Sequence, residues 1–208
     1  MSVLRTLLLA LLAACCVACS SKKNEPLPPG TVVLALGDSL TAGYGLTPEQ
    51  AWPAHLAEKT GWRLINGGVS GNTAGDALAR LPALLDEHAP RLVLVTLGGN
   101  DMLRKLPEAQ TRQDLFRILE LARGRHAPPV LLATPKPSVA GAVFQNLSAP
   151  SFYAEVAKER QVPLIADAVP DVLSDPALKL DTLHPNAEGH RVLAGKVFDG
   201  LRRLGYVR

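Results

Sequence analysis

Cysteine is absent from most of the sequence. The three cysteines among the 208 residues, Cys15, Cys16 and Cys19, all lie near the start of the chain. The remainder therefore forms no disulfide and no thiolate metal site. An apolar core must hold the fold together, and a hydrophobic content of 47% is sufficient for one domain of this size.

Long runs of like charge are also missing. The chain has 22 Lys and Arg against 19 Asp and Glu, which gives a net charge of +3. Proteins that bind nucleic acid usually present a basic stripe to the phosphates, and no such stripe is visible here. We therefore expect no nucleic-acid partner, and we expect a monomer that needs no cofactor.

The first residues have the pattern of an export signal. Arg5 ends a short basic segment and is followed by an apolar run, residues 6–18, which is too short to span a membrane comfortably. Small residues precede both Cys15 and Cys19, and each site resembles the lipobox of bacterial lipoproteins, in which the cysteine is acylated. An ordinary cleaved signal peptide with incidental cysteines is the alternative.

This leader divides the chain into three parts. We predict a signal peptide with a lipobox over residues 1–19, a polar, proline-containing tether over residues 20–30, and a single domain over residues 31–208. Either kind of leader places the domain outside the cytoplasm, in the periplasm or cell envelope. Lipidation of Cys15 or Cys19 would also anchor it to a membrane.

Strands and helices are expected to alternate along the domain. Apolar runs rich in β-branched residues predict buried strands, and apolar residues at helical spacing predict helices. We expect strands at residues 31–36, 62–65, 92–97, 130–133 and 162–166, and helices at 48–59, 72–88, 108–123, 150–160 and 186–203. This alternation predicts an α/β fold with a parallel sheet. Pro82 predicts a kink in the second helix or a later start for it.

Three short motifs carry candidate catalytic residues: Gly37–Leu40, Gly98–Asp101 and Asp181–Pro185. The first two directly follow predicted strands. In an open parallel sheet, the loops at the carboxyl ends of the strands form the site, above all where the strand order reverses. With the order 2-1-3-4-5, the strands that precede Ser39 and Asn100 are neighbours, and their helices leave on opposite faces. Ser39 and Asn100 would then flank one crevice.

A nucleophilic Ser39 needs a base, and His184 is the best candidate among the five histidines. Asp181, three residues earlier, can accept a hydrogen bond from one ring nitrogen and leave the other facing Ser39. Pro185 restricts His184 to an extended backbone and suits the first position of the last helix. The remaining histidines are interpreted as surface or structural groups: His55, His88, His126 and His190.

An oxyanion formed at Ser39 needs preorganised hydrogen-bond donors. The candidates are the backbone N–H of Ser39, the side-chain amide of Asn100, and Gly71 in the glycine-rich loop after the second strand. Asn100 could instead cap the next segment, and Gly71 could be only a turn glycine. No metal site is expected, because the acids and histidines of the last motif region lack an established ligand spacing: Asp181, His184, Glu188 and His190.

From Thr31 to about Leu201 these motifs resemble the SGNH (GDSL) hydrolase family, and most closely its bacterial periplasmic branch of acyl-thioesterases, lysophospholipases and arylesterases. The resemblance implies a three-layer α/β/α, flavodoxin-like sandwich. It also implies a triad of Ser39, His184 and Asp181, with Gly71, Asn100 and the Ser39 amide as oxyanion hole. Residues 136–150, which shape the acyl groove in that family, show no convincing match.

We therefore expect a serine esterase, thioesterase or lysophospholipase that works through an acyl-enzyme on Ser39. Its partners would be a small acyl-ester or lipid substrate and, through the lipid anchor, a membrane. A carbohydrate O-deacetylase on the same scaffold is the alternative enzyme. A non-catalytic lipid- or glycan-binding lipoprotein is the alternative without chemistry; the intact set of motif residues argues against it.

Overall fold

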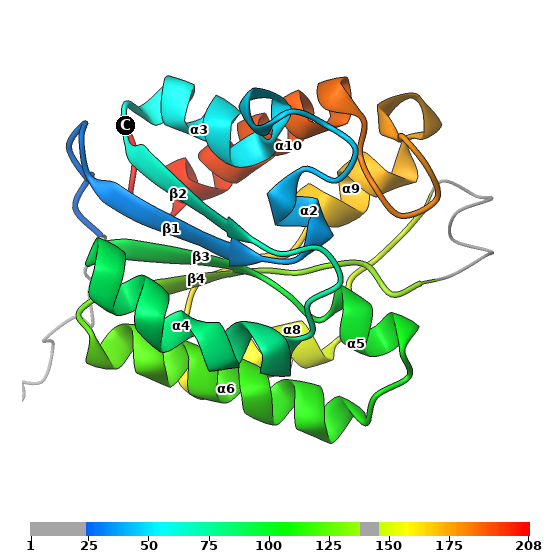
Figure 1. The fold of residues 1–208 in the computed structure, drawn as a ribbon, viewed down its shortest axis with the longest axis horizontal. Coiled ribbons are helices and arrows are strands. Elements are labelled where there is room, and N and C mark those ends of the chain that lie inside the picture. Colours follow the sequence, from blue (N-terminus) through cyan, green and yellow to red (C-terminus); the bar gives the residue numbers. More distant parts are fainter. Residues whose placement is uncertain (1–23, 138–145) are drawn as a thin grey trace, which may run out of the picture.

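A computed structural model describes residues 24–137 and 146–208 as a three-layer α/β/α sandwich (Figure 1). The central sheet has five parallel strands in the order β2-β1-β3-β4-β5. Their bounds are β1 (Val32–Gly37), β2 (Arg63–Gly68), β3 (Leu92–Thr96), β4 (Pro129–Leu132) and β5 (Leu164–Ile165). The predicted fold class, strand direction and order are confirmed.

The central strands are buried on both faces, as their uninterrupted apolar sequences predicted. In β3, Leu92 and Leu94 belong to one hydrophobic core, and Val93 and Val95 belong to the other. Successive side chains of a strand point to opposite faces, so one apolar run supplies both cores.

Within residues 24–137 and 146–208, three helices cover each face of the sheet (Figure 1). One face carries α3 (Trp52–Thr60), α9 (Ala168–Ser174) and α10 (Ala187–Arg203), and the other carries α4 (Ala74–His88), α6 (Glu108–Gly124) and α8 (Phe152–Arg160). The helices that follow β1 and β3 therefore lie on opposite faces, as the predicted order requires. Within the residues described, no helix is both long enough and apolar enough to cross a membrane.

Some helical boundaries differ from the prediction. The segment expected as one helix at 48–59 is divided into a short 3-10 turn, η1 (Pro48–Gln50), and α3. Helix α4 begins at Ala74 and continues through Pro82, so the later start was wrong. Its start is fixed by a capping box, in which Thr73 and Asp76 satisfy each other's backbone N–H groups.

Residues 24–30, the second part of the predicted tether, lie along the amino-terminal edge of the sheet. The Asn24 side chain donates to Leu204 O at 2.9 Å, and Leu27 N donates to Tyr206 O at 2.9 Å. Trp62, directly before β2, donates its indole N–H to Leu27 O at 3.2 Å. In Figure 1 this blue segment lies at the strand tails, away from the arrowheads.

Candidate active site

Ser39 is the first residue of a short helix, α2 (Ser39–Ala42), that begins directly behind β1. The helix packs onto the end of the neighbouring strand β2. A Cβ atom on Gly68, the last residue of β2, would lie 2.2 Å from Ala42 N. A glycine at this position therefore allows α2 to hold Ser39 close to the carboxyl edge of the sheet.

His184 and Asp181 lie in the loop between the 3-10 turn η2 (Pro176–Leu178) and α10. Asp181 Oδ1 accepts the backbone N–H groups of Leu183 and His184 at 2.7 and 2.8 Å. His184 Nδ1 lies 2.8 Å from Asp181 Oδ2. One carboxylate thus fixes both the loop backbone and the imidazole ring.

Partial burial by itself would raise the pKa of Asp181. Hydrogen bonds from the His184 ring and from the backbone of Leu183 and His184 outweigh it and lower the pKa below its ordinary value. Asp181 therefore carries the negative charge that a hydrogen-bonded imidazole needs when it gains a proton.

Pro185 takes a different place from the one predicted. It forms an isolated antiparallel bridge with Lys179, and α10 begins only at Ala187, with the Asn186 side chain accepting Gly189 N–H at 2.9 Å. Asn186 supplies the cap because a side-chain acceptor satisfies a free helical N–H group, which proline cannot do.

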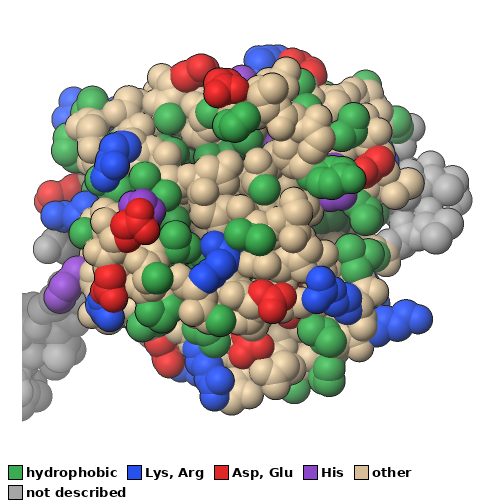
Figure 2. All heavy atoms as spheres, viewed as in Figure 1, with side chains coloured by type: hydrophobic (Ala, Val, Ile, Leu, Met, Phe, Trp, Pro, Cys, Tyr) green, Lys and Arg blue, Asp and Glu red, His purple; other side chains and the backbone are tan. Residues whose placement is uncertain are grey.

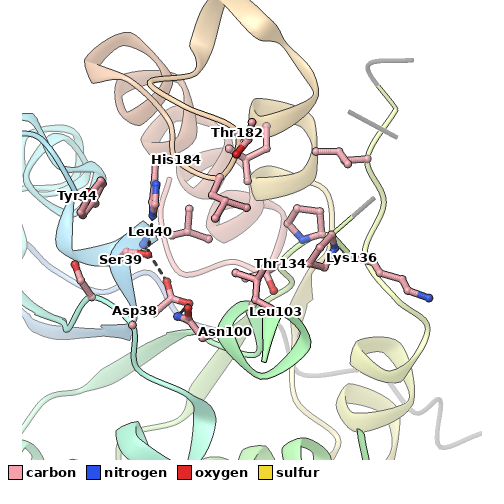
Figure 3. A pocket seen from close by; sticks show the side chains of 18 residues that line it. Asp38, Ser39, Leu40, Tyr44, Asn100, Leu103, Thr134, Lys136, Thr182 and His184 are labelled. Carbon is pink, nitrogen blue, oxygen red and sulfur yellow. Dashed lines mark hydrogen bonds between the residues drawn. The ribbon is translucent and has the colours of Figure 1, made fainter. Parts of the chain in front are cut away.

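The predicted triad residues come together in space. His184 Nε2 lies 3.0 Å from Ser39 Oγ, although the two residues are 145 positions apart in the chain (Figure 3). The hydrogen bonds therefore run from Asp181 through His184 to Ser39. Such an arrangement can remove the hydroxyl proton as the oxygen attacks a carbonyl.

Ser39, Gly71 and Asn100 line the same cavity. Asn100 lies in a short helix, α5 (Gly99–Leu103), directly after β3, and Gly71 has a φ of +83°, which favours glycine. Within the two described stretches, no acceptor pairs with the backbone N–H of Ser39 or of Gly71. Both groups remain free to donate to a bound oxygen.

The Asn100 amide is held by two acceptors. Its Nδ2 donates to Asp38 Oδ2 at 3.2 Å and to Asn72 O at 3.0 Å. The Asp38 carboxylate is 1% exposed and also accepts Leu40 N–H at 2.9 Å, which caps α2. Burial raises the pKa of Asp38 to about 6, against the lowering effect of the Leu40 N–H and the charge on His184.

Two arginines hold the glycine-rich loop that carries Gly71. Arg80 donates through Nε to Asn72 Oδ1 at 2.8 Å and through Nη2 to Gly37 O at 2.9 Å. Arg104 donates to Gly71 O at 2.7 Å. The loop is therefore fastened to both the end of β1 and the helix α5.

Tyr44 packs against the imidazole of His184, with ring centroids 4.4 Å apart and planes inclined by 30°. Tyr44 lies just beyond α2, and Figure 3 shows it on the side of His184 away from the cavity's Leu40 wall. The sequence motifs did not identify Tyr44, Arg80 or Arg104. Tyr44 follows the Gly37–Leu40 motif by four residues, and this closeness in sequence is a signal that could have placed it near the site.

The cavity in front of Ser39 has a volume of about 830 Å³. Leucines form much of its wall: Leu40, Leu103, Leu147, Leu173 and Leu183. Of the segment at 136–150, Lys136, Pro137 and Leu147 line this cavity, and Leu147 N–H donates to Ser174 Oγ at 2.8 Å. An apolar hollow next to a nucleophile suits an acyl chain.

The other histidines stand apart from Ser39. His190 is fully buried, and its Nδ1 accepts Trp52 N–H at 3.1 Å, so the structural interpretation is confirmed. His126 is exposed, whereas His55 and His88 are partly buried beside glutamates. In the described part of the chain, no three His, Cys, Asp or Glu side chains are grouped so as to hold a metal ion. Cys15 and Cys19 lie outside the described residues.

A serine, a histidine and an aspartate joined by hydrogen bonds at the carboxyl edge of a flavodoxin-like sheet are the arrangement found in a class of serine hydrolases. The sequence profile of the GDSL-like Lipase/Acylhydrolase family matches residues 35–192. The chain belongs to this family.

Named relatives agree with that assignment. The chain is 40% identical over 167 residues to thioesterase 1/protease 1/lysophospholipase L1 of Escherichia coli K12. This match covers 78% of the present chain and 79% of the relative. It is 34% identical over 193 residues to an arylesterase of Vibrio mimicus, with coverage of 90% and 93%. The protein is thus an ester-hydrolysing enzyme.

A solved structure supports the fold independently. The psychrotrophic esterase EstA of Pseudoalteromonas sp., in a structure inhibited by monoethylphosphonate, superposes with a TM-score of 0.73 at 28% identity. The match covers 83% of this chain and 97% of that chain. The resemblance to the SGNH hydrolases that the motifs indicated is therefore confirmed.

Proposed function

We propose that Ser39 is the nucleophile of an acyl esterase, with His184 as general base and Asp181 as the residue that orients it. The observation that carries this proposal is the chain of short contacts from Asp181 to Ser39, at the wall of the leucine-lined cavity. The substrate class would be carboxylic esters or thioesters of acyl chains.

The reaction would proceed in two halves. Ser39 Oγ attacks the carbonyl carbon while His184 Nε2 takes the hydroxyl proton, and the same nitrogen then protonates the departing alkoxide or thiolate. Water attacks the resulting acyl-enzyme and gives its proton to His184. Collapse of the second tetrahedral intermediate releases the fatty acid and restores the Ser39 hydroxyl.

The negative oxygen of each intermediate would be bound by Ser39 N–H, Gly71 N–H and the Asn100 amide. The two backbone groups have no acceptor within the described residues, so they are in place before charge develops on the oxygen. The Asn100 amide faces the same cavity, and one of its two N–H groups must leave Asp38 or Asn72 to donate to the oxygen.

The site is expected outside the cytoplasm, in the periplasm or cell envelope, with a lipid on Cys15 or Cys19 and the domain as a monomer. Such a location favours carboxyl esters and lysophospholipids over acyl-CoA, which is scarce there. Mass spectrometry of the mature N-terminus tests the anchor. Diacylglyceryl mass on neither cysteine would exclude it.

Hydrolysis of p-nitrophenyl esters from acetyl to palmitoyl tests the reaction, with Ser39→Ala beside the wild type. We expect activity on medium or long chains that disappears in the variant. A p-nitrophenyl alkylphosphonate should phosphonylate Ser39 Oγ with release of p-nitrophenol, so that the mass of the phosphonyl group appears on the wild type, more slowly on Asp181→Asn, and not on Ser39→Ala.

Other outcomes would point elsewhere. Activity on acetyl esters alone would favour the O-deacetylase. No activity on any ester, together with no phosphonate adduct, would favour a binding protein that retains the motifs without using them.

A further inference from the structure

Large apolar side chains that remain exposed are concentrated at one end of the molecule. Within the residues described, six such side chains are at least 40% exposed, and we call them the apolar rim: Tyr44, Val69, Leu103, Leu106, Leu180 and Leu183. All six lie in segments at the carboxyl edge of the sheet, where Ser39 also lies. Scattered exposed leucines need no explanation, but a patch confined to one edge does.

The members of the rim are neighbours around one opening. Tyr44, Leu103 and Leu183 line the cavity in front of Ser39. A Cβ atom on Gly45 would lie 2.6 Å from Leu180 Cδ2, which places Leu180 beside Tyr44. The rim is therefore built from several different loops around the cavity mouth.

The other two members extend the rim beyond the cavity. Leu106 and Leu103 both line a second hollow of about 390 Å³ next to the first. Val69 precedes Ser70, which lines the cavity. Val69, Leu106 and Leu180 lie outside the cavity wall. A soluble substrate molecule bound inside the cavity would therefore not contact these three residues, and its binding does not explain why they are apolar.

Lysines without acidic partners accompany the rim. Lys105, Lys136 and Lys179 form no ion pair in residues 24–137 and 146–208, and the two segments outside those ranges contain no Asp or Glu. Lys105 stands between Leu103 and Leu106, Lys136 lines both hollows, and Lys179 adjoins Leu180.

Three acids near the same edge already have partners. Asp181 holds His184, Asp76 caps α4 and faces Arg104, and Glu108 faces Arg112. The rim is thus apolar and is accompanied by lysines that form no ion pair within the described residues. On the face drawn in Figure 2, in contrast, acidic and basic side chains are interspersed.

We propose that the apolar rim docks the carboxyl edge of the sheet onto an anionic lipid surface. Exposed leucines and an aromatic residue would enter the interface between headgroups and acyl chains, and the lysines would meet the anionic headgroups. The cavity mouth would then open directly into the layer that holds acyl chains. This docking goes beyond the proposed reaction and requires no step of it.

Vesicle flotation tests the docking without catalysis. Residues 24–208, which contain every strand and helix described above, are used with Ser39→Ala, so that no lipid anchor and no hydrolysis contribute. We expect binding to vesicles of phosphatidylglycerol and phosphatidylcholine, and at least tenfold weaker binding to phosphatidylcholine alone. Raising the salt concentration should weaken the first interaction.

Variants locate the contact. Leu106→Ser should weaken binding to anionic vesicles about three- to tenfold, because the leucine is 40% exposed and only this fraction is left to enter the lipid. Lys105→Glu should weaken it more, whereas Arg63→Glu, the same charge change at the amino-terminal edge, should leave it unchanged. In the background with Ser39 intact, Leu106→Ser should retain the wild-type rate on a soluble short-chain ester.

Three results would overturn the proposal. Vesicle binding by the Ser39→Ala protein without further changes that is too weak to detect would exclude a lipid surface. An equal loss of vesicle binding in Arg63→Glu and in Lys105→Glu would show that the protein adsorbs to the vesicles through its net charge alone. Dimers in light scattering that dissociate with Leu106→Ser would show that the rim covers a second copy of the chain. Failure of ester hydrolysis leaves these measurements intact, because they use Ser39→Ala.

Discussion

The Asn100 side chain donates to the buried carboxylate of Asp38, with 3.2 Å between Asn100 Nδ2 and Asp38 Oδ2. Asp38 belongs to the strand β1–helix α2 junction and Asn100 to the start of α5, so the contact joins the segments on the two sides of the cavity. The carboxylate fixes how the amide is turned before any substrate arrives. Because Asn72 O accepts the other N–H group, one of these two bonds must be exchanged before the amide can donate to an oxyanion.

Replacing Asp38 by asparagine should disturb that orientation. In Asp38→Asn, Oδ1 can still accept Leu40 N–H, but the new Nδ2 opposes the Asn100 amide, since both groups are donors. We expect kcat to fall about tenfold to hundredfold, less than the roughly 10²–10³-fold loss on complete removal of an oxyanion donor. Steady-state kinetics measure this, and an unchanged kcat would show that Asp38 acts only as the helix cap.

Asp38 should also make stability depend on pH. Because burial raises its pKa to about 6 from 3.8, the neutral form is favoured in the folded protein. The neutral carboxyl group of Asp38 stabilises the folded protein fully below about pH 4. This stabilisation is lost as pH rises through about 6, and the free energy of unfolding falls by roughly 3 kcal/mol. Urea unfolding at several pH values should show this loss in the wild type and not in Asp38→Asn.

His190 should produce the opposite slope. Burial, with a smaller effect from the charges on His55 and His184, lowers its pKa to about 4 from 6.5. The folded protein therefore favours neutral imidazole, and stability is lost as pH falls from about 6.5 towards 4. His190→Asn keeps an acceptor for Trp52 N–H and should lose this dependence in the same urea series. If the slope stays as in the wild type, the buried imidazole does not titrate.

Tyr44 should support His184 during the reaction. An aromatic pair in contact contributes about 0.5–1.5 kcal/mol beyond its buried area, and the contact here is to the imidazole that we propose as general base. We expect Tyr44→Ala to lower kcat about three- to tenfold and Tyr44→Phe to restore it. A change in KM alone, with kcat retained, would instead show that Tyr44 only contacts the acyl chain.

Arg80 should fasten the loop that carries Gly71. Its guanidinium bonds both Gly37 O and the Asn72 side chain, and lysine cannot reproduce that two-sided geometry. We predict that Arg80→Lys lowers kcat about three- to tenfold and lowers the free energy of unfolding by about 1–2 kcal/mol. Arg63→Lys, on the exposed start of β2, is the matched control and should change neither value.

The sequence predicted most of the sheet because β1 and β3 are buried on both faces and read as unbroken apolar runs. The spacing of Asp181 and His184 also sufficed, since their contact is local. Short helices such as α2, α5 and α9 were not predicted, because so few residues show no helical period.

The site contacts that the sequence did not predict join residues that lie far apart in the chain. Asp38 and Asn100 are 62 positions apart, and Arg80 and Gly37 are 43 apart. Nothing near Arg80 in the sequence distinguishes it from a solvent-exposed helical arginine. Its role follows only from the sheet order that brings β1 beside β2.

The packing of residues 24–30 on the amino-terminal edge determines which way an anchored enzyme can face. From a lipid on Cys19, the chain to Asn24 reaches at most about 17 Å. Strand β1 alone is about 20 Å long, and the apolar rim lies beyond its far end. With Cys19 acylated, the strands therefore cannot stand upright with the catalytic end on the membrane that holds the lipid, and an upright molecule presents that end to lipid held elsewhere. With Cys15 acylated, the reach grows to about 31 Å, and the enzyme can lie back on the bilayer that holds it. The choice of cysteine would then decide which membrane supplies the substrate.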